Sequence, residues 1–156
     1  MASTIRAVKD WLALVKWGAS GLGEGTARRL IKHGASVITK DRDVEEALKI
    51  VKAKFHKLDV TVNCAGIGVA SKIYNFKKDS PHSLDDFMKT LNVNTIGTFN
   101  VIRQAVGLMG KNAPDEDGQK GVVINTASVA AFEGQRGQVA YSASKGGIVR
   151  HDIAIG

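Results

Sequence analysis

The stretch Trp11-Leu-Ala-Leu-Val-Lys-Trp17, followed directly by Gly18-Ala-Ser-Gly-Leu-Gly23, decides the fold of this chain. The first part is apolar and predicts a strand, and residues 25–33 predict a helix that Gly34 ends. Glycines placed between a strand and a helix let the backbone turn tightly and approach a pyrophosphate closely. This stretch therefore indicates a β-α unit with a glycine-rich turn.

The rest of the chain continues this alternation of strands and helices. Apolar residues at helical spacing predict a helix over 43–56, Ser83 is the expected N-cap of a long helical segment that ends near Met109, and a last helix begins near Gln138. Further strands are expected at 36–39, 59–63 and 121–125. The alternation predicts an α/β fold with a doubly wound parallel sheet, Rossmann-like, as a single domain over residues 1–156.

Composition sets limits on function. Hydrophobic residues make up 44% and charged residues 24% of the 156, as in ordinary globular proteins, and no apolar run approaches the length of a membrane span. A single cysteine, Cys64, excludes an internal disulfide, and the four histidines show no metal-binding spacing, so no metal is predicted. The net charge of +7 suits nucleic acid, acidic membranes or anionic substrates, but lysines scattered over helix faces favour a solvated surface.

Tyr141-Ser-Ala-Ser-Lys145 carries the clearest chemistry in the sequence. Side chains four residues apart on a helix lie on the same face, one turn apart. An ammonium placed beside a phenol favours the ionised form of the phenol, which makes it a usable acid or base near neutral pH. Ser128 follows a buried-strand pattern and is placed to hydrogen-bond a substrate oxygen next to Tyr141.

Three further features in the same chain give these residues a context. They are the glycine-rich turn, Asn63-Cys-Ala-Gly66 after the third strand, and Asn94 in the long helical segment. Together with Ser128 and Tyr141-x-x-x-Lys145, and in this order, they resemble the short-chain dehydrogenase/reductase family. The resemblance runs over nearly the whole chain and is most specific from Asp59 to Val149.

The resemblance implies which residues form the site. Catalytic roles fall on Asn94, Ser128, Tyr141 and Lys145, with Ser128 and Tyr141 contacting the substrate. Cofactor-binding roles fall on Ser20, Gly21, Leu22, Gly23, Asp41, Cys64, Ala65, Gly66, Tyr141 and Lys145. Asp41 is placed to accept hydrogen bonds from ribose hydroxyls, which selects NAD over NADP. Cys64 is expected to pack at the strand end beside the cofactor rather than to act as a nucleophile. Asn94 has two interpretations: a residue that caps or kinks its own helix, or the holder of a water in a proton relay.

The resemblance also implies an activity and partners. It implies an oxidoreductase of fatty acid metabolism that oxidises 3-hydroxyacyl-CoA esters or hydroxysteroids with NAD, works as a homo-oligomer in mitochondria, and has a tRNA-processing complex as a further partner. The basic N-terminus, 1–9, is short for a transit peptide, so the mitochondrial expectation rests on the resemblance alone.

The chain departs from the family pattern at three places. Lys16 and Trp17 stand where the family has threonine and the first turn glycine. One α-β unit that normally follows Asp41 is absent, and so is everything that the family has beyond the helix of Lys145. We therefore expect an incomplete sheet, shortened internally and truncated at its C-terminus. Two functions stay open: the dehydrogenase, or a catalytically inactive homologue that serves as a scaffold or interaction subunit or has no function.

Overall fold

The computed structural model describes residues 8–39 and 43–154. Its chain forms two compact units, one made of residues 1–64 and 102–124 and the other of residues 65–101 and 125–156. The single domain over 1–156 remains a prediction. None of the helices in the described part of the chain is long and apolar enough to cross a membrane.

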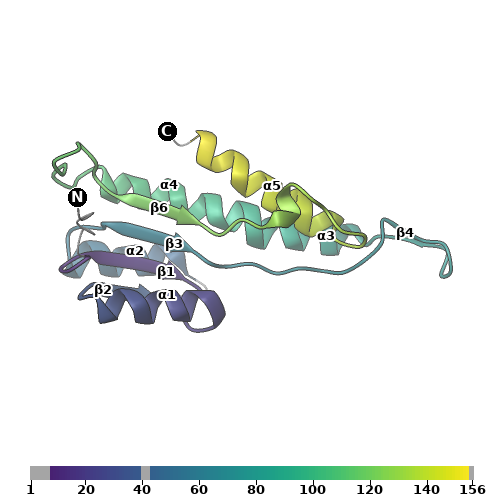
Figure 1. Cartoon of the computed structure of the whole chain (residues 1–156), viewed down its shortest axis with the longest axis horizontal. Coiled ribbons are helices and arrows are strands. Elements are labelled where there is room, and N and C mark those ends of the chain that lie inside the picture. The colour runs from purple at the N-terminus through teal and green to yellow at the C-terminus, as the bar shows by residue number, and fades with distance from the viewer. Residues whose placement is uncertain (1–7, 40–42, 155–156) are drawn as a thin grey trace, which may run out of the picture. The chain divides into compact units, whose positions relative to one another are not determined.

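The first unit is built on a four-stranded sheet with the order β2-β1-β3-β6. Its strands are β1 (Leu12–Lys16), β2 (Ser36–Thr39), β3 (Val60–Asn63) and β6 (Val122–Asn125), and its helices include α1 (Gly21–Lys32) and α2 (Val44–Lys54) (Figure 1). The central strand β1 pairs in parallel with β2 on one side and β3 on the other. The doubly wound, Rossmann-like sheet predicted from the sequence is therefore confirmed.

Apolar residues on both faces of β1 and β3 explain why these strands lie in the centre of the sheet. Parallel strands covered by helices on both faces are apolar throughout, and the burial of β1 and β3 follows that rule. One cluster of buried residues joins them to α1: Ala13, Val15, Ala27, Val60 and Val62. Cys64 is partly buried and packs against this cluster.

The passage from β2 to β3 shows the shortened connection that the sequence predicts. After β2 the chain enters α2 at Val44, and the next strand, β3, lies on the far side of β1. Within the described residues no strand lies outside β2, so it forms an edge of the sheet with Ser36 and Thr39 exposed. An edge strand leaves backbone hydrogen-bonding groups without a strand partner.

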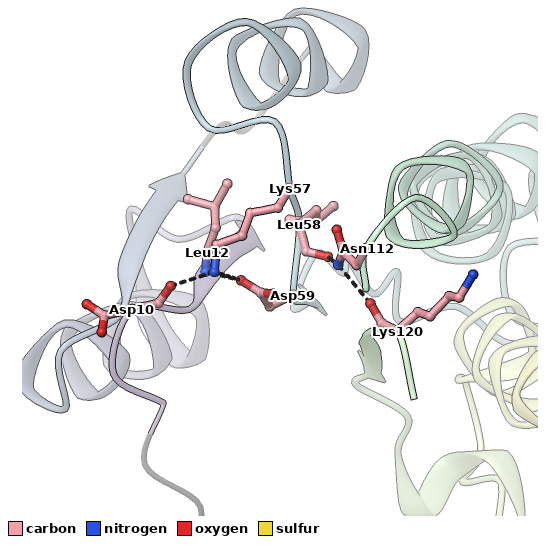
Figure 2. A network of polar contacts seen from close by, with 7 residues as sticks. All are labelled: Asp10, Leu12, Lys57, Leu58, Asp59, Asn112 and Lys120. Atoms are coloured by element: carbon pink, nitrogen blue, oxygen red, sulfur yellow. Dashed lines mark hydrogen bonds and ion pairs between the residues drawn. The ribbon is translucent and has the colours of Figure 1, made fainter. Parts of the chain in front are cut away.

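Polar contacts fix the N-terminal edge of this sheet (Figure 2). The backbone N–H of Leu12 donates to the Asp59 carboxylate over 2.7 Å, which ties the starts of β1 and β3 together. The Asn112 amide donates to the carbonyls of Leu58 and Lys120, at 2.8 Å each. The loop that leads to β6 is thereby held against the entry to β3.

The second unit contains a long interrupted helix and the helix of the Tyr-Lys pair. Its elements are β4 (Tyr74–Asn75), β5 (Ser80–Pro81), α3 (Leu84–Leu91), a π-helical segment (Asn92–Ile96), the start of α4 (Gly97–Met109), a 3₁₀ turn (Val129–Ala131) and α5 (Val139–Ala154). Ser83 caps α3 as predicted, its hydroxyl accepting from the N–H of Asp86 at 3.2 Å. The predicted long helical segment ends at Met109, as expected, and within it the π-helical segment interrupts the α-helical hydrogen-bond pattern.

Two glycines of α1 give the first testable prediction. A Cβ atom at Gly23 would lie 2.0 Å from the carbonyl oxygen of Trp17, whereas a Cβ atom at Gly25 would meet no atom of the described part of the chain within 4 Å. We expect Gly23→Ala to lower the free energy of unfolding by about 2 kcal/mol or more, because backbone must move to make room. Gly25→Ala is the matched control, and we expect it to raise stability by roughly 1 kcal/mol, the helix propensity of alanine over glycine. Urea unfolding followed by circular dichroism measures both, and equal effects of the two variants would contradict the prediction.

Candidate active site

The glycine-rich turn of the first unit is shaped by close packing and by positive backbone angles. A Cβ atom at Gly18 would lie 2.3 Å from the Thr39 methyl group, so glycine is required there, as it is at Gly23. Gly21 has φ +54°, and no atom of the described residues lies within 4 Å of where its Cβ would be. The prediction that the helix starts at Gly25 is wrong: α1 begins four residues earlier, at Gly21.

The first turn of α1 fits an anionic group. Ser20 is the N-cap, with φ −154° and no hydrogen bond from its side chain to the helix backbone. A helix start carries N–H groups and a partial positive charge, which together favour phosphate oxygens. Glu24 in the same turn is engaged with Arg28 through a 2.8 Å ion pair. Backbone at Ser20 and Gly21 is thus suited to a pyrophosphate.

Trp17 occupies the position of the first turn glycine, and its large side chain does not suit that position. Its φ is +60°, the left-handed region that glycine adopts without strain and that a bulky residue enters at a cost of about 1–2 kcal/mol. Its side chain is half-buried. The backbone has therefore kept the conformation of a turn glycine while carrying an indole.

The other predicted cofactor residues are placed unevenly. Asp41 lies outside the described residues. Leu22 is exposed, Ala65 is buried, and Gly66 lies over the helix of the Tyr-Lys pair: a Cβ atom at Gly66 would be 3.6 Å from Lys145 Nζ and 3.7 Å from Asn94 Oδ1. Three of the predicted residues, Gly66, Asn94 and Lys145, thus meet in the second unit.

The Tyr-Lys pair of α5 has the geometry that its spacing predicts. Lys145 is only 3% exposed, and its ammonium donates a hydrogen bond to the carbonyl of Thr126. The same ammonium lies 5.8 Å from the centre of the Tyr141 ring. A pocket of about 380 Å³ opens beside this ring, lined by residues 66–70, Gln138 and Tyr141. A half-buried phenol next to a buried cation, at the wall of a pocket, is suited to proton transfer with a bound substrate.

Asn94 connects this helix to the loop that covers it. It is fully buried in the π-helical segment. Its side-chain amide forms two hydrogen bonds with the backbone of Ile67: Oδ1 accepts from the Ile67 N–H, and Nδ2 donates to the Ile67 carbonyl, at 2.8 Å each. The α-helical pattern is interrupted at Asn94, but the hydrogen bonds of its side chain go to the backbone of Ile67 and do not cap its own helix. The role in a proton relay stays a prediction.

Ser128 begins the 3₁₀ turn that packs against α5. Its hydroxyl oxygen accepts from the N–H of Ala130 over 3.2 Å. Because this bond uses the oxygen as an acceptor, the hydroxyl is suited to act toward a substrate oxygen as a donor.

Sequence reasoning missed Ser144, which holds the site together. It is fully buried; its hydroxyl accepts from Asn94 Nδ2 at 2.9 Å and donates to the carbonyl of Tyr141 at 2.7 Å. Its carbonyl accepts from the Thr95 hydroxyl at 2.9 Å. The sequence could have indicated this role, because residues three apart on a helix lie on the same face and Ser144 follows Tyr141 at that spacing.

Replacement of Ser144 tests this connection. We expect Ser144→Ala to destabilise the chain by about 1–3 kcal/mol, because a buried amide proton of Asn94 loses an acceptor. Ser142→Ala is the matched control, since the buried Ser142 hydroxyl has no hydrogen-bond partner among the described residues and its removal should be nearly neutral. Thermal unfolding of both variants measures the difference, and a Ser142 effect as large as the Ser144 effect would argue against it.

Comparison with known proteins gives this site its class. The family model described as short chain dehydrogenase matches residues 38–151. The chain is 52% identical to the 3-hydroxyacyl-CoA dehydrogenase type-2 of Bos taurus and to that of Homo sapiens, over 99% of this chain and 70% of each relative. A crystal structure of 3-hydroxyacyl-CoA dehydrogenase type-2 from Mycobacterium avium superposes with a TM-score of 0.84 at 31% identity, covering 97% of this chain and 70% of that one.

This chain belongs to the short-chain dehydrogenase family, an oxidoreductase family whose members are built around a nicotinamide cofactor. Within the family it is closely related to 3-hydroxyacyl-CoA dehydrogenase type-2. The region aligned with the bovine and human proteins is 182 residues long, whereas this chain has 156, a difference of 26 (182 − 156). At least that many positions of the aligned region therefore have no counterpart here, in agreement with the short connection from β2 to β3.

Proposed function

We propose that this chain oxidises the secondary alcohol of 3-hydroxyacyl-CoA esters or hydroxysteroids with NAD. The buried Lys145 ammonium next to the Tyr141 ring, at the wall of a 380 Å³ pocket, is the observation that carries the proposal. The names of the relatives supply the 3-hydroxyacyl-CoA class, and the hydroxysteroid class rests on the family resemblance.

Each residue of the second unit has a role in the proposed reaction. Tyr141, in its phenolate form, takes the proton of the substrate alcohol and becomes the phenol. Lys145 stabilises the phenolate through its charge, and Ser128 donates a hydrogen bond to the substrate oxygen. Asn94 holds the loop at Ile67 over α5 through its paired hydrogen bonds and, in the proposal, a relay water. NAD, when bound, supplies the hydride-accepting chemistry.

The cofactor is proposed to use the residues that the family pattern assigns. Backbone of Ser20, Gly21, Leu22 and Gly23 holds the pyrophosphate, and the open face of Gly21 and the uncapped start of α1 support this. Asp41 favours NAD over NADP. Cys64, Ala65 and Gly66 line the cofactor, and Tyr141 and Lys145 bind its nicotinamide ribose.

A second function has its own support. Trp17 in a left-handed turn position and the shortened connection after β2 favour weak cofactor binding, and with it a non-catalytic role as a scaffold or interaction subunit. Under either function, we propose that the chain forms a homo-oligomer, is located in mitochondria and has a tRNA-processing complex as a partner.

An assay separates the two functions. The purified chain is incubated with a 3-hydroxyacyl-CoA ester or a hydroxysteroid and either NAD or NADP, and formation of the reduced nucleotide is followed by absorbance. We expect turnover that prefers NAD at least tenfold. The absence of turnover at saturating nucleotide, in a chain that is folded by circular dichroism, would favour the non-catalytic subunit.

A further inference from the structure

The hairpin of the second unit presents apolar side chains to solvent. It runs from Ser71 to His82 through β4 and β5 and projects away from α3 (Figure 1). Phe76, at its turn, is 88% exposed, and Ile73 is 73% exposed. Turn residues are ordinarily polar or glycine. The ring of Phe76 contacts that of Tyr74, with the centroids 5.0 Å apart, but most of its surface, like that of Ile73 just before β4, is open to solvent.

The backbone of this hairpin is held in place, so the two side chains are presented by a defined surface. Ser71 and Gly137 are joined by a 2.9 Å backbone hydrogen bond at one end, and the N–H of His82 donates to the carbonyl of Ile73 at 2.8 Å at the other. Inside the turn, the Asn75 side chain accepts from the N–H groups of Lys77 and Lys78.

The charge of the hairpin is positive. Lys72, Lys77 and Lys78 are exposed, and Asp79 is the one acidic residue between Ser71 and His82. The Tyr74 hydroxyl donates to the Asp79 carboxylate over 2.6 Å. This hydrogen bond raises the pKa of Tyr74, with a smaller contribution from burial, so the hydroxyl stays protonated and the tyrosine adds no negative charge.

We propose that this hairpin docks on an anionic lipid surface, with Phe76 and Ile73 entering the headgroup boundary and Lys72, Lys77 and Lys78 contacting lipid phosphates. Apolar side chains between lysines are the pattern of interfacial membrane binding. The proposal is independent of the dehydrogenase chemistry and stands or falls separately from it.

A lipid surface fits this hairpin better than single-stranded nucleic acid does. Recognition of bases uses exposed aromatic rings for stacking together with donors for the base edges. Here the Tyr74 hydroxyl is held by Asp79, the turn N–H groups of Lys77 and Lys78 are held by Asn75, and the second exposed side chain is the aliphatic Ile73. An aliphatic side chain gains from acyl chains and not from a base.

Sedimentation with vesicles tests the proposal. The full chain is mixed with vesicles of phosphatidylcholine alone or with about one-third phosphatidylserine, which gives the surface its negative potential. We expect binding to the anionic vesicles only, weakened by salt. The triple variant Lys72→Gln/Lys77→Gln/Lys78→Gln should bind on the order of 100-fold more weakly, about fivefold for each lysine. Phe76→Ser should bind at least ~10-fold more weakly.

Two matched controls make the result specific to the hairpin. Lys49→Gln/Lys52→Gln/Lys54→Gln removes the same charge from exposed positions of α2, and Phe132→Ser removes a phenylalanine that is 77% exposed elsewhere in the second unit. Both should bind like the parent chain. All four variants change exposed residues, and circular dichroism verifies their folding.

Several outcomes would overturn the proposal. They are equal binding to neutral vesicles, equal losses in the hairpin and control variants, and no vesicle binding at all. Single-stranded RNA that binds through the same lysines, or self-association through Phe76 seen by light scattering while vesicles stay unbound, would assign the hairpin to another partner.

Discussion

Replacing Tyr141 by phenylalanine should lower the turnover of a 3-hydroxyacyl-CoA ester by ~10²-fold or more. The substitution keeps the ring beside Lys145 and removes the phenolic oxygen that takes the substrate proton, and a general acid–base group usually contributes a factor of this size. The measurement is the steady-state rate of NADH formation.

Tyr74→Phe is the matched control for this variant. It removes a tyrosine hydroxyl from the exposed hairpin, where the bond is to Asp79, and should leave the rate unchanged. Binding of NADH, followed by fluorescence, should be altered little in Tyr141→Phe, because the cofactor keeps its other contacts. A Tyr141→Phe rate equal to that of the parent chain would show that the Tyr-Lys pair is not the acid–base group.

The second large effect concerns the turn at Trp17. Trp17→Gly should raise the affinity for NAD at least tenfold, because it removes the indole from the turn that is proposed to hold the pyrophosphate, while glycine keeps the backbone at φ +60°. Tenfold corresponds to about 1.4 kcal/mol of binding free energy. Titration calorimetry measures the affinity of both chains.

Trp17→Ala separates the effect of the indole on binding from the effect of backbone strain on folding. Alanine removes the indole but keeps a Cβ atom in the left-handed region, so its affinity for NAD should be close to that of Trp17→Gly, while its free energy of unfolding should be lower than that of Trp17→Gly. Trp11→Phe, at a half-buried position before β1, should leave the affinity unchanged. An unchanged affinity in Trp17→Gly would mean that the shortened connection after β2, and not Trp17, limits nucleotide binding.

Much of the sheet is predictable because its strands are short, buried and apolar. Turn residues bound the short apolar segments Leu12–Lys16 and Val60–Asn63, and such segments are typical of buried strands. The order β2-β1-β3-β6 follows from the parallel topology once the α-β unit after Asp41 is missing. The caps at Asp43 and Ser83 follow the side-chain chemistry of their residue types.

Other features depend on partners that the sequence does not name. The π-helical segment at Asn92–Ile96 shares the apolar pattern of an α-helix, and Asn94 takes its place there through the backbone of Ile67, 27 residues away. The β4–β5 hairpin has strands of two residues each, too short to give a period-two pattern. The start of α1 at Gly21 depends on a positive φ that glycine permits but does not require.

The candidate site likewise has parts that the sequence predicts and parts that it does not. The Tyr141–Lys145 pair is predictable, because helical spacing alone brings the two side chains to one face. The bond of Lys145 to the Thr126 carbonyl and the bridge of Ser144 between Asn94 and α5 are not, because any backbone carbonyl can accept such bonds.

The most direct test of the account compares turnover of a 3-hydroxyacyl-CoA ester with NAD in three chains: the parent, Trp17→Gly and Trp17→Gly/Tyr141→Phe. We predict that at subsaturating NAD Trp17→Gly is at least as active as the parent, and that the added Tyr141→Phe lowers its rate by ~10²-fold or more. A double variant that turns over as fast as Trp17→Gly would contradict the account.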